Sequence, residues 1–101
     1  EKKKLIVIDD VELNRAVLKE AFKHEFDVLE AENGAVGLNV IKENKNNIAA
    51  IFLDIIMPEM DGFTVLQELN INSLIQNIPV FLITTDASSS VIERAYDYGA
   101  V

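Results

Sequence analysis

The sequence predicts a doubly wound α/β fold, and two observations lead to this prediction. Short apolar runs alternate with amphipathic stretches along the chain, in a strand–helix order that repeats four times. Three of the four runs are apolar throughout, which is typical of parallel strands that helices cover on both faces. The chain has 101 residues, of which 50% are hydrophobic, so residues 1–101 form one domain with enough apolar side chains for a single core.

The elements follow from the period of the apolar residues. The expected strands are LIVI at 5–8, DVLEA at 27–31, IAAIFL at 48–53 and PVFLI at 79–83. The expected helices are 12–23, 35–42, 63–69 and 88–98. Their apolar stripes include Leu13, Val17 and Ala21 in the first helix, and Val36 and Val40 in the second. A helical pattern follows the Asn-Gly pair at 33–34, so we interpret Asn33 as a helix start rather than as part of a hairpin.

Composition excludes several classes of function. The net charge is -8, which disfavours binding of this segment to nucleic acid or to an anionic membrane. The apolar runs are far shorter than the ~20 residues of a membrane span. There is no cysteine, which excludes disulfides and thiolate metal sites and weakly favours a cytoplasmic location.

Polar residues follow three of the expected strands, at the point where each strand ends. Asp9 and Asp10 follow the first run, Asp54 follows the third, and Thr84 and Thr85 follow the fourth. In an open parallel sheet these positions gather at one edge. Three carboxylates in one place repel one another, so the cluster requires a cation or a shared proton. Because the expected ligands are oxygen atoms, Mg²⁺ is the expected cation.

Each acid alone has a second interpretation, which is the capping of the next helix. Asp9 with Glu12 resembles a capping box, although a strict one begins with Ser or Thr. Capping does not explain Asp54, because Pro58 follows closely and the residue before a proline avoids helical geometry. An acid beside a bound cation suits attack on phosphorus, and Thr84 would hydrogen-bond a phosphoryl oxygen.

Five segments carry a resemblance to a known family over the whole chain. They are LIVIDD, AENG, FLDIIMPEMDGF, PVFLITT and YDYGA, of which the third is highly specific. With these motifs the sequence resembles the receiver domain of two-component response regulators. The resemblance implies a flavodoxin-like fold with strand order 2-1-3-4. It also implies a self-phosphorylating and self-dephosphorylating acceptor domain rather than a turnover enzyme.

The resemblance also implies a role for each residue of the site. Asp54 would accept a phosphoryl group from a sensor histidine kinase or a phosphotransfer protein. Asp10 would ligate Mg²⁺ directly, Asp9 through water, and Ile56 through its backbone carbonyl. Thr84 would move towards the phosphoryl group as the switch hydroxyl, and the backbone N–H of Thr85 would contact it.

The chain departs from the family at its end. Receiver domains carry a lysine at the end of a fifth strand, which would lie a few residues past Val101. We therefore expect a C-terminally incomplete domain without the fifth strand and helix, and an output domain in the parent chain. The run PVFLI would then be an apolar edge that allows dimerisation.

Three alternative functions use related architectures. A pseudo-receiver would act only as a protein-binding module, and the missing lysine keeps this interpretation open. A phosphatase of the haloacid dehalogenase type requires a second acid at position 56, where this chain has Ile56. A flavin-binding electron carrier requires a Gly- or hydroxyl-rich phosphate loop after the first strand, whereas DDVELN is acidic and repels phosphate.

Overall fold

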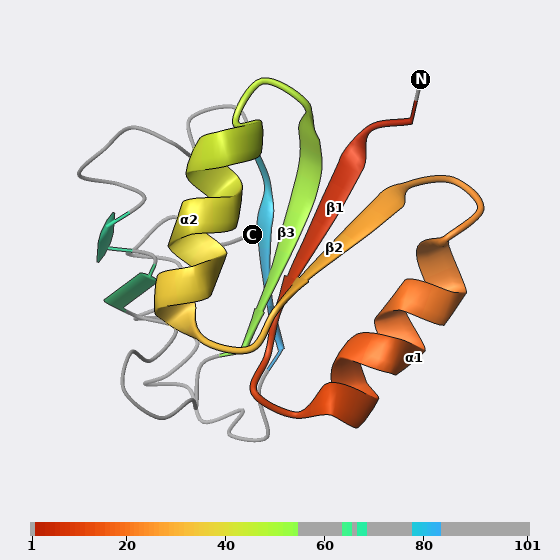
Figure 1. The fold of residues 1–101 in the computed structure, drawn as a ribbon, viewed down its shortest axis with the longest axis horizontal. Coiled ribbons are helices and arrows are strands. Elements are labelled where there is room, and N and C mark those ends of the chain that lie inside the picture. Colours follow the sequence, from red (N-terminus) through yellow and green to blue (C-terminus); the bar gives the residue numbers. More distant parts are fainter. Residues whose placement is uncertain (1, 55–63, 66, 69–77, 84–101) are drawn as a thin grey trace.

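The computed structural model describes residues 2–54, 64–65, 67–68 and 78–83, and it contains a parallel four-stranded sheet (Figure 1). The strand order is β2-β1-β3-β4, as the resemblance to receiver domains implies. The strands are β1 Lys4–Ile8, β2 Asp27–Ala31, β3 Ile48–Asp54 and β4 Val80–Ile83. The helices are α1 Glu12–Phe22 and α2 Gly34–Asn44, and residues 64–65 and 67–68 are also helical. The helix predicted at 88–98 lies outside the described residues.

Strand β1 is the centre of the sheet. It pairs with β2 from Lys4↔Asp27 to Ile8↔Ala31, and its other edge pairs with β3. The four apolar residues of β1 are at most 2% exposed, so both faces of the strand are covered. The unbroken apolar run LIVI predicts this arrangement, because a strand with one wet face would alternate with polar residues.

The two helices cover opposite faces of the sheet. Successive side chains of a strand point to opposite faces, so Ile51 and Leu53 share one face and Phe52 lies on the other. On the first face, α2 closes a core that consists of Ile6, Ile8, Ala31, Leu38, Ile41, Ile48, Ile51, Leu53, Val65 and Val80. On the other face, the ring of Phe22 in α1 stacks on Phe52, with ring centroids 5.7 Å apart.

The prediction of which side of α1 faces the sheet is wrong. Leu13 and Val17 are 70% and 60% exposed, and Ala21 is exposed as well. The side of α1 that faces the sheet carries Phe22 instead, whose ring contacts both Phe26 and Phe52. This aromatic packing sets the rotation of the helix, because large rings bury more apolar area than Val or Ala.

The prediction for α2 is partly right. Asn33 begins the helix as predicted, since its side-chain oxygen accepts a hydrogen bond of 2.9 Å from the backbone N–H of Val36. Val40 packs against the core, but Val36 is 38% exposed. The residues of α2 that are buried are Gly34, Gly37, Leu38 and Ile41. In the described part of the chain, neither helix has the length and apolar character needed to cross a bilayer.

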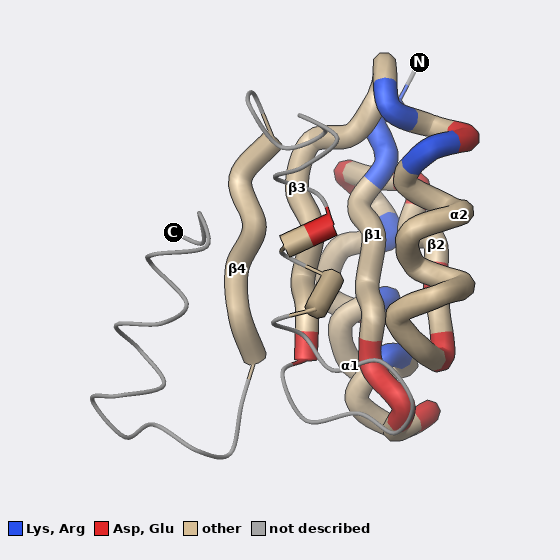
Figure 2. The backbone as a smooth tube through the Cα atoms, turned by 90° about the vertical axis from the view of Figure 1, so that its left-hand side faces the viewer, with Lys and Arg blue, Asp and Glu red and all other residues tan. Residues whose placement is uncertain are grey.

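Lysines gather at one end of the strands and acids at the other, although charges of both signs also lie along the helices (Figure 2). Lysines occupy residues 2–4, where β1 begins, and Lys42 and Lys45 lie at the end of α2. Cations are favourable at a helix C-terminus because they meet the negative end of the helix dipole. At the end of α1, the Lys23 ammonium lies 2.8 Å from a carboxylate oxygen of Glu20 and lowers the pKa of that carboxyl group. At the opposite side of the sheet, Asp9 and Asp10 follow β1 and Asp54 ends β3.

Replacing Gly37 with alanine is expected to destabilise the domain by about 1–3 kcal/mol, as overpacking does in a filled core. A Cβ atom at this position would lie 2.5 Å from Cδ1 and 2.7 Å from Cγ1 of Ile8, which is fully buried. The clash outweighs the gain of about 1 kcal/mol in helix propensity. Urea unfolding of Gly37→Ala measures the loss.

Two further variants test this explanation. Asn39→Ala changes an exposed residue of the same helix and is expected to leave the domain as stable as wild type or slightly more stable. Ile8→Val removes the Cδ1 atom, so combining it with Gly37→Ala is expected to recover part of the lost stability. Equal stability of Gly37→Ala and wild type would contradict the close packing of α2 on β1.

Candidate metal centre

Three carboxylates meet at one edge of the sheet. Asp9 and Asp10 directly follow β1, and Asp54 is the last residue of β3. Because β1 and β3 are parallel neighbours, their ends lie side by side, and one carboxylate oxygen from each acid lies within 4.8 Å of the others. This edge is also where the chain connections diverge to opposite sides of β1, the usual ligand position of open parallel sheets. The structure therefore brings the three acids together as the sequence predicts.

The three acids have different surroundings. Asp9 is fully buried, Asp10 is exposed and Asp54 is half-buried. Both carboxylate oxygens of Asp9 accept hydrogen bonds: Oδ1 from the backbone N–H of Val11 at 2.8 Å, and Oδ2 from Asn14 Nδ2 at 3.2 Å. These two donors compensate for the removal of the carboxylate from water.

The capping interpretation of Asp9 does not hold. The N-cap of α1 is Val11, whose side chain makes no capping hydrogen bond. Asp9 instead accepts from the N–H two residues ahead, the local bond that Asp commonly makes in a turn. Its carboxylate therefore stabilises the turn before the helix and does not cap the first turn of α1.

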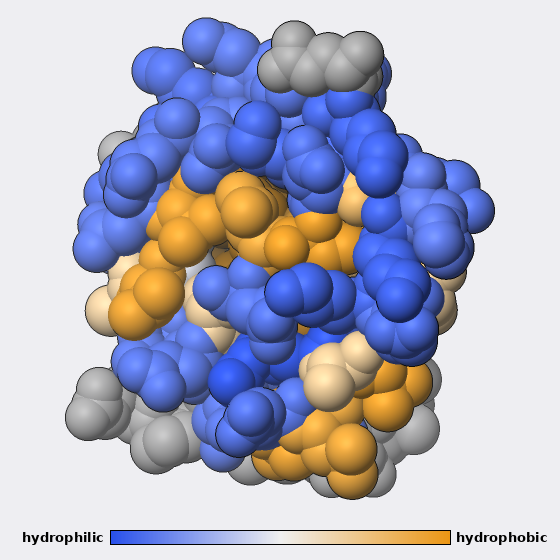
Figure 3. Space-filling model, turned by 45° about the vertical axis from the view of Figure 1, so that its right-hand side comes forward, coloured by the Kyte–Doolittle hydropathy of each residue, from blue (hydrophilic) through white to orange (hydrophobic). Residues whose placement is uncertain are grey.

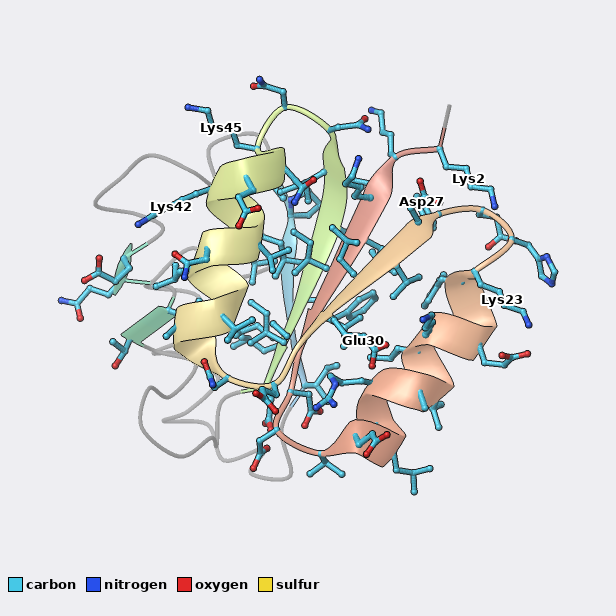
Figure 4. The ribbon with its side chains drawn as sticks, in the orientation of Figure 1. Lys2, Lys23, Asp27, Glu30, Lys42 and Lys45 are labelled. Atoms are coloured by element: carbon cyan, nitrogen blue, oxygen red, sulfur yellow. The ribbon has the colours of Figure 1, made fainter. Side chains whose placement is uncertain are left out.

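Arg15 ties the site to the neighbouring strand. One terminal guanidinium nitrogen donates to the backbone carbonyl of Asp9 at 2.8 Å, and Nε donates to Glu30 Oε1 at 3.2 Å. The Arg15 side chain is only 14% exposed, and Glu30 lies between β2 and α1 (Figure 4). Lys19 also reaches Glu30, at 3.6 Å. One side chain thus connects the end of β1, helix α1 and strand β2.

Sequence reasoning missed Asn14 and Arg15, because polar residues on an amphipathic helix are usually assigned to solvent. Their positions in the sequence give one indication that they contact the acid pair. They follow the acid pair closely, in the first two turns of the next helix, and side chains there lean back towards the helix start.

The donor set fits a hard divalent cation. The described cluster offers only carboxylate oxygens, which Mg²⁺ prefers, and three negative charges that a dication would offset. Opposite ligands of octahedral Mg²⁺ are about 4.2 Å apart. The carboxylate oxygens here, within 4.8 Å of one another, require only a small adjustment or a bridging water.

Three of the predicted site residues lie outside the described part of the chain. They are Ile56, Thr84 and Thr85. The described residue before Thr84 is Ile83, which pairs in register with Asp54 at the end of the β3–β4 ladder.

An apolar surface adjoins the acids. Val11 and Leu13, at the start of α1, are 45% and 70% exposed. Figure 3 shows apolar atoms gathered at the lower end of the molecule, which is the end where α1 begins.

Comparisons with known proteins agree with this architecture. A family model described as the response regulator receiver domain matches residues 5–101. Among curated proteins, Histidine kinase P4 of Formosa agariphila is 33% identical over 88 residues, which cover 87% of this chain and 6% of that kinase. The chain spans only 6% to 22% of the length of the first curated relatives that it matches.

Two solved structures are similar in fold. The chemotaxis protein CheY4 of Vibrio cholerae has a TM-score of 0.91 at 22% identity, over 100% of this chain and 83% of that one. A chain from the CheX–CheY–BeF3–Mg²⁺ complex of Borrelia burgdorferi has a TM-score of 0.86 at 27% identity, over 97% of this chain and 73% of that one. Together with the family model, which covers nearly the whole length, they establish the flavodoxin-like fold. The chain belongs to the response regulator receiver domain family.

Proposed function

We propose that this domain is a signalling switch that accepts a phosphoryl group on Asp54 in an Mg²⁺-dependent reaction. The observation that carries the proposal is the cluster of three carboxylates within 4.8 Å at the ends of β1 and β3. Asp9 is unsuited to attack an external phosphorus, because it is buried and both its oxygens accept hydrogen bonds. Asp54 is half-buried, so it is accessible, and the sheet holds its backbone.

The residues that would hold Mg²⁺ are Asp9, Asp10 and Asp54, with the backbone carbonyl of Ile56. The exposed Asp10 suits direct ligation. The hydrogen bonds that already occupy both oxygens of Asp9 favour a contact through water. When bound, the cation neutralises charge that develops on the phosphoryl oxygens.

In the transfer step, an oxygen of Asp54 attacks the phosphorus of a donor phosphohistidine. A P–O bond forms to the carboxylate, the P–N bond breaks, and the imidazole nitrogen keeps the electron pair of that bond. Such transfers depend mainly on positioning and charge. We assign Thr84 as the switch hydroxyl and the Thr85 backbone N–H as a second contact, with the pairing of Ile83 and Asp54 as support.

The donor in this proposal is a protein, either a sensor histidine kinase or a phosphotransfer protein. The exposed Val11 and Leu13 provide an apolar contact surface next to the acids. The match to part of a histidine kinase agrees with a role in that kind of pathway. A cytoplasmic location, an output domain in the parent protein and dimerisation through an exposed edge remain predictions.

Phosphorylation of Asp54 is the first prediction of this proposal. After incubation with Mg²⁺ and a small-molecule phosphodonor, intact-mass measurement is expected to show one phosphoryl adduct on wild type and none on Asp54→Asn. Asp27→Asn is the matched control, because Asp27 is an exposed acid at the opposite end of the sheet. It is expected to gain the adduct as wild type does.

The absence of an adduct on folded wild-type protein would contradict the proposal. The domain would then act as a pseudo-receiver, a protein-binding module without phosphoryl chemistry. An adduct that persists in Asp54→Asn would assign the acceptor to another residue.

Charge repulsion at the cluster gives a second prediction. Without Mg²⁺, Asp10→Asn is expected to stabilise the domain by about 1 kcal/mol, the Coulomb energy of one like-charge pair at this spacing in water. With Mg²⁺ at about 100 times its Kd, wild type is expected to gain about 3 kcal/mol and Asp10→Asn much less. Urea unfolding with EDTA and with Mg²⁺ measures both effects.

Glu43→Gln is the control for this measurement. It removes one exposed negative charge on α2, away from the cluster, and is expected to keep the full gain on addition of Mg²⁺. An equal response of Asp10→Asn and wild type to Mg²⁺ would exclude Asp10 as a ligand.

A further inference from the structure

We infer that Asn14 and Arg15 are positioning residues that hold Asp9 in the orientation that Mg²⁺ binding requires. The inference rests on the proposed function, because it concerns the same cation site. Neither residue is expected to touch the cation. Each acts through Asp9, Asn14 on its carboxylate and Arg15 on its backbone.

Asn14 fixes the rotation of the Asp9 carboxylate. Its amide nitrogen donates to Oδ2 at 3.2 Å while the Val11 N–H donates to Oδ1 at 2.8 Å, so both oxygens are held from the α1 side. Each carboxylate oxygen has a second lone pair, which remains available for a metal-bound water. Without Asn14, one bond would hold the group, and the carboxylate could turn about it.

Arg15 fixes the backbone beneath the same acid. Its bond of 2.8 Å to the Asp9 carbonyl holds the peptide that joins Asp9 to Asp10, so it constrains both acids. The second bond, from Nε to Glu30 at 3.2 Å, orients the planar guanidinium from β2. Lysine has one donor group and cannot make both bonds in this planar geometry.

Partners that orient metal ligands in this way typically contribute 10–100-fold to metal affinity. A competing explanation is that Asn14 merely packs against its neighbours. It is exposed and lines a shallow, open surface pocket together with Val17, Leu18, Phe52 and Ile83. The two explanations differ in the expected effect of an apolar replacement, because leucine would keep the packing contacts in this pocket but could not donate a hydrogen bond to Asp9.

The test is a titration of the full chain with Mg²⁺ alone, followed by NMR shifts of backbone amides, together with Tm measured in EDTA. Asn14→Leu is expected to raise the Kd for Mg²⁺ about tenfold or more. Its Tm in EDTA is expected to fall modestly, because the buried Asp9 loses one donor, and to stay well above the temperature of the titration. A role in packing alone predicts an unchanged Kd. Asn39→Leu makes the same substitution on the exposed side of α2 and is expected to keep the wild-type Kd.

Arg15→Lys keeps the charge and removes the two-point contact, so it is also expected to weaken Mg²⁺ binding. Its control is Lys19→Arg, which exchanges the same two residue types at the other partner of Glu30 and does not touch Asp9. Because both variants preserve net charge, a difference between them reports geometry and not electrostatic attraction.

The outcomes separate this inference from the proposal beneath it. Wild-type affinity in both Asn14→Leu and Arg15→Lys would overturn the inference and leave the metal site intact. An absence of Mg²⁺ binding by folded wild type would contradict the proposed function and the inference together. Weaker binding in both variants, with both controls at wild-type affinity, supports the positioning role.

Discussion

The burial of β1 on both faces and its pairing on both edges is the constraint on which the described structure depends. Strand β1 places β2 and β3 beside it, and helices α1 and α2 cover its two faces. A one-residue shift of this strand would break its pairing register with both β2 and β3 and would exchange the side chains that pack on its two faces. The acids that follow it are therefore held at a defined level of the sheet, next to the end of β3.

This rigid placement creates an electrostatic conflict. Three carboxylates held within 4.8 Å repel one another, yet their spacing suits a dication. The protein relieves part of the conflict locally by giving Asp9 two hydrogen-bond donors and by placing the Arg15 guanidinium against its backbone. Such an arrangement lowers the cost of the metal-free state while keeping the ligands in place. Repulsion among these carboxylates lowers the stability of the fold, and the proposed chemistry requires the same negative charges. Such a conflict between stability and activity is common at functional sites.

The α/β class and the meeting of Asp9, Asp10 and Asp54 could be predicted from the sequence, because unbroken apolar runs indicate parallel strands and acids follow the first and third of these runs. The strand order was implied by the resemblance to receiver domains. The start of α2 at Asn33 followed from local capping chemistry. These features depend on residues that are close in sequence or on the general geometry of parallel sheets.

The rotation of α1 could not be predicted in this way. The stripe of Leu13, Val17 and Ala21 is as regular as the packed one, and only the contact of Phe22 with Phe52, thirty residues on, decides between them. The roles of Asn14 and Arg15 were missed for a similar reason. Their partners are a carboxylate turned back towards the helix and, for Arg15, an acid on a neighbouring strand. Long-range contacts of this kind leave no periodic signal.

The sorting of charge along the strands has a consequence at distances beyond contact. Lysines lie where β1 begins and where α2 ends, and acids lie where β1 and β3 end, so the described part of the domain is an electric dipole (Figure 2). A dipole turns in the field of an approaching charged surface before the two molecules meet. The torque fades over roughly 8 Å at physiological ionic strength. The ionic strength therefore influences which end of the domain a partner meets first, before any side chain is touched.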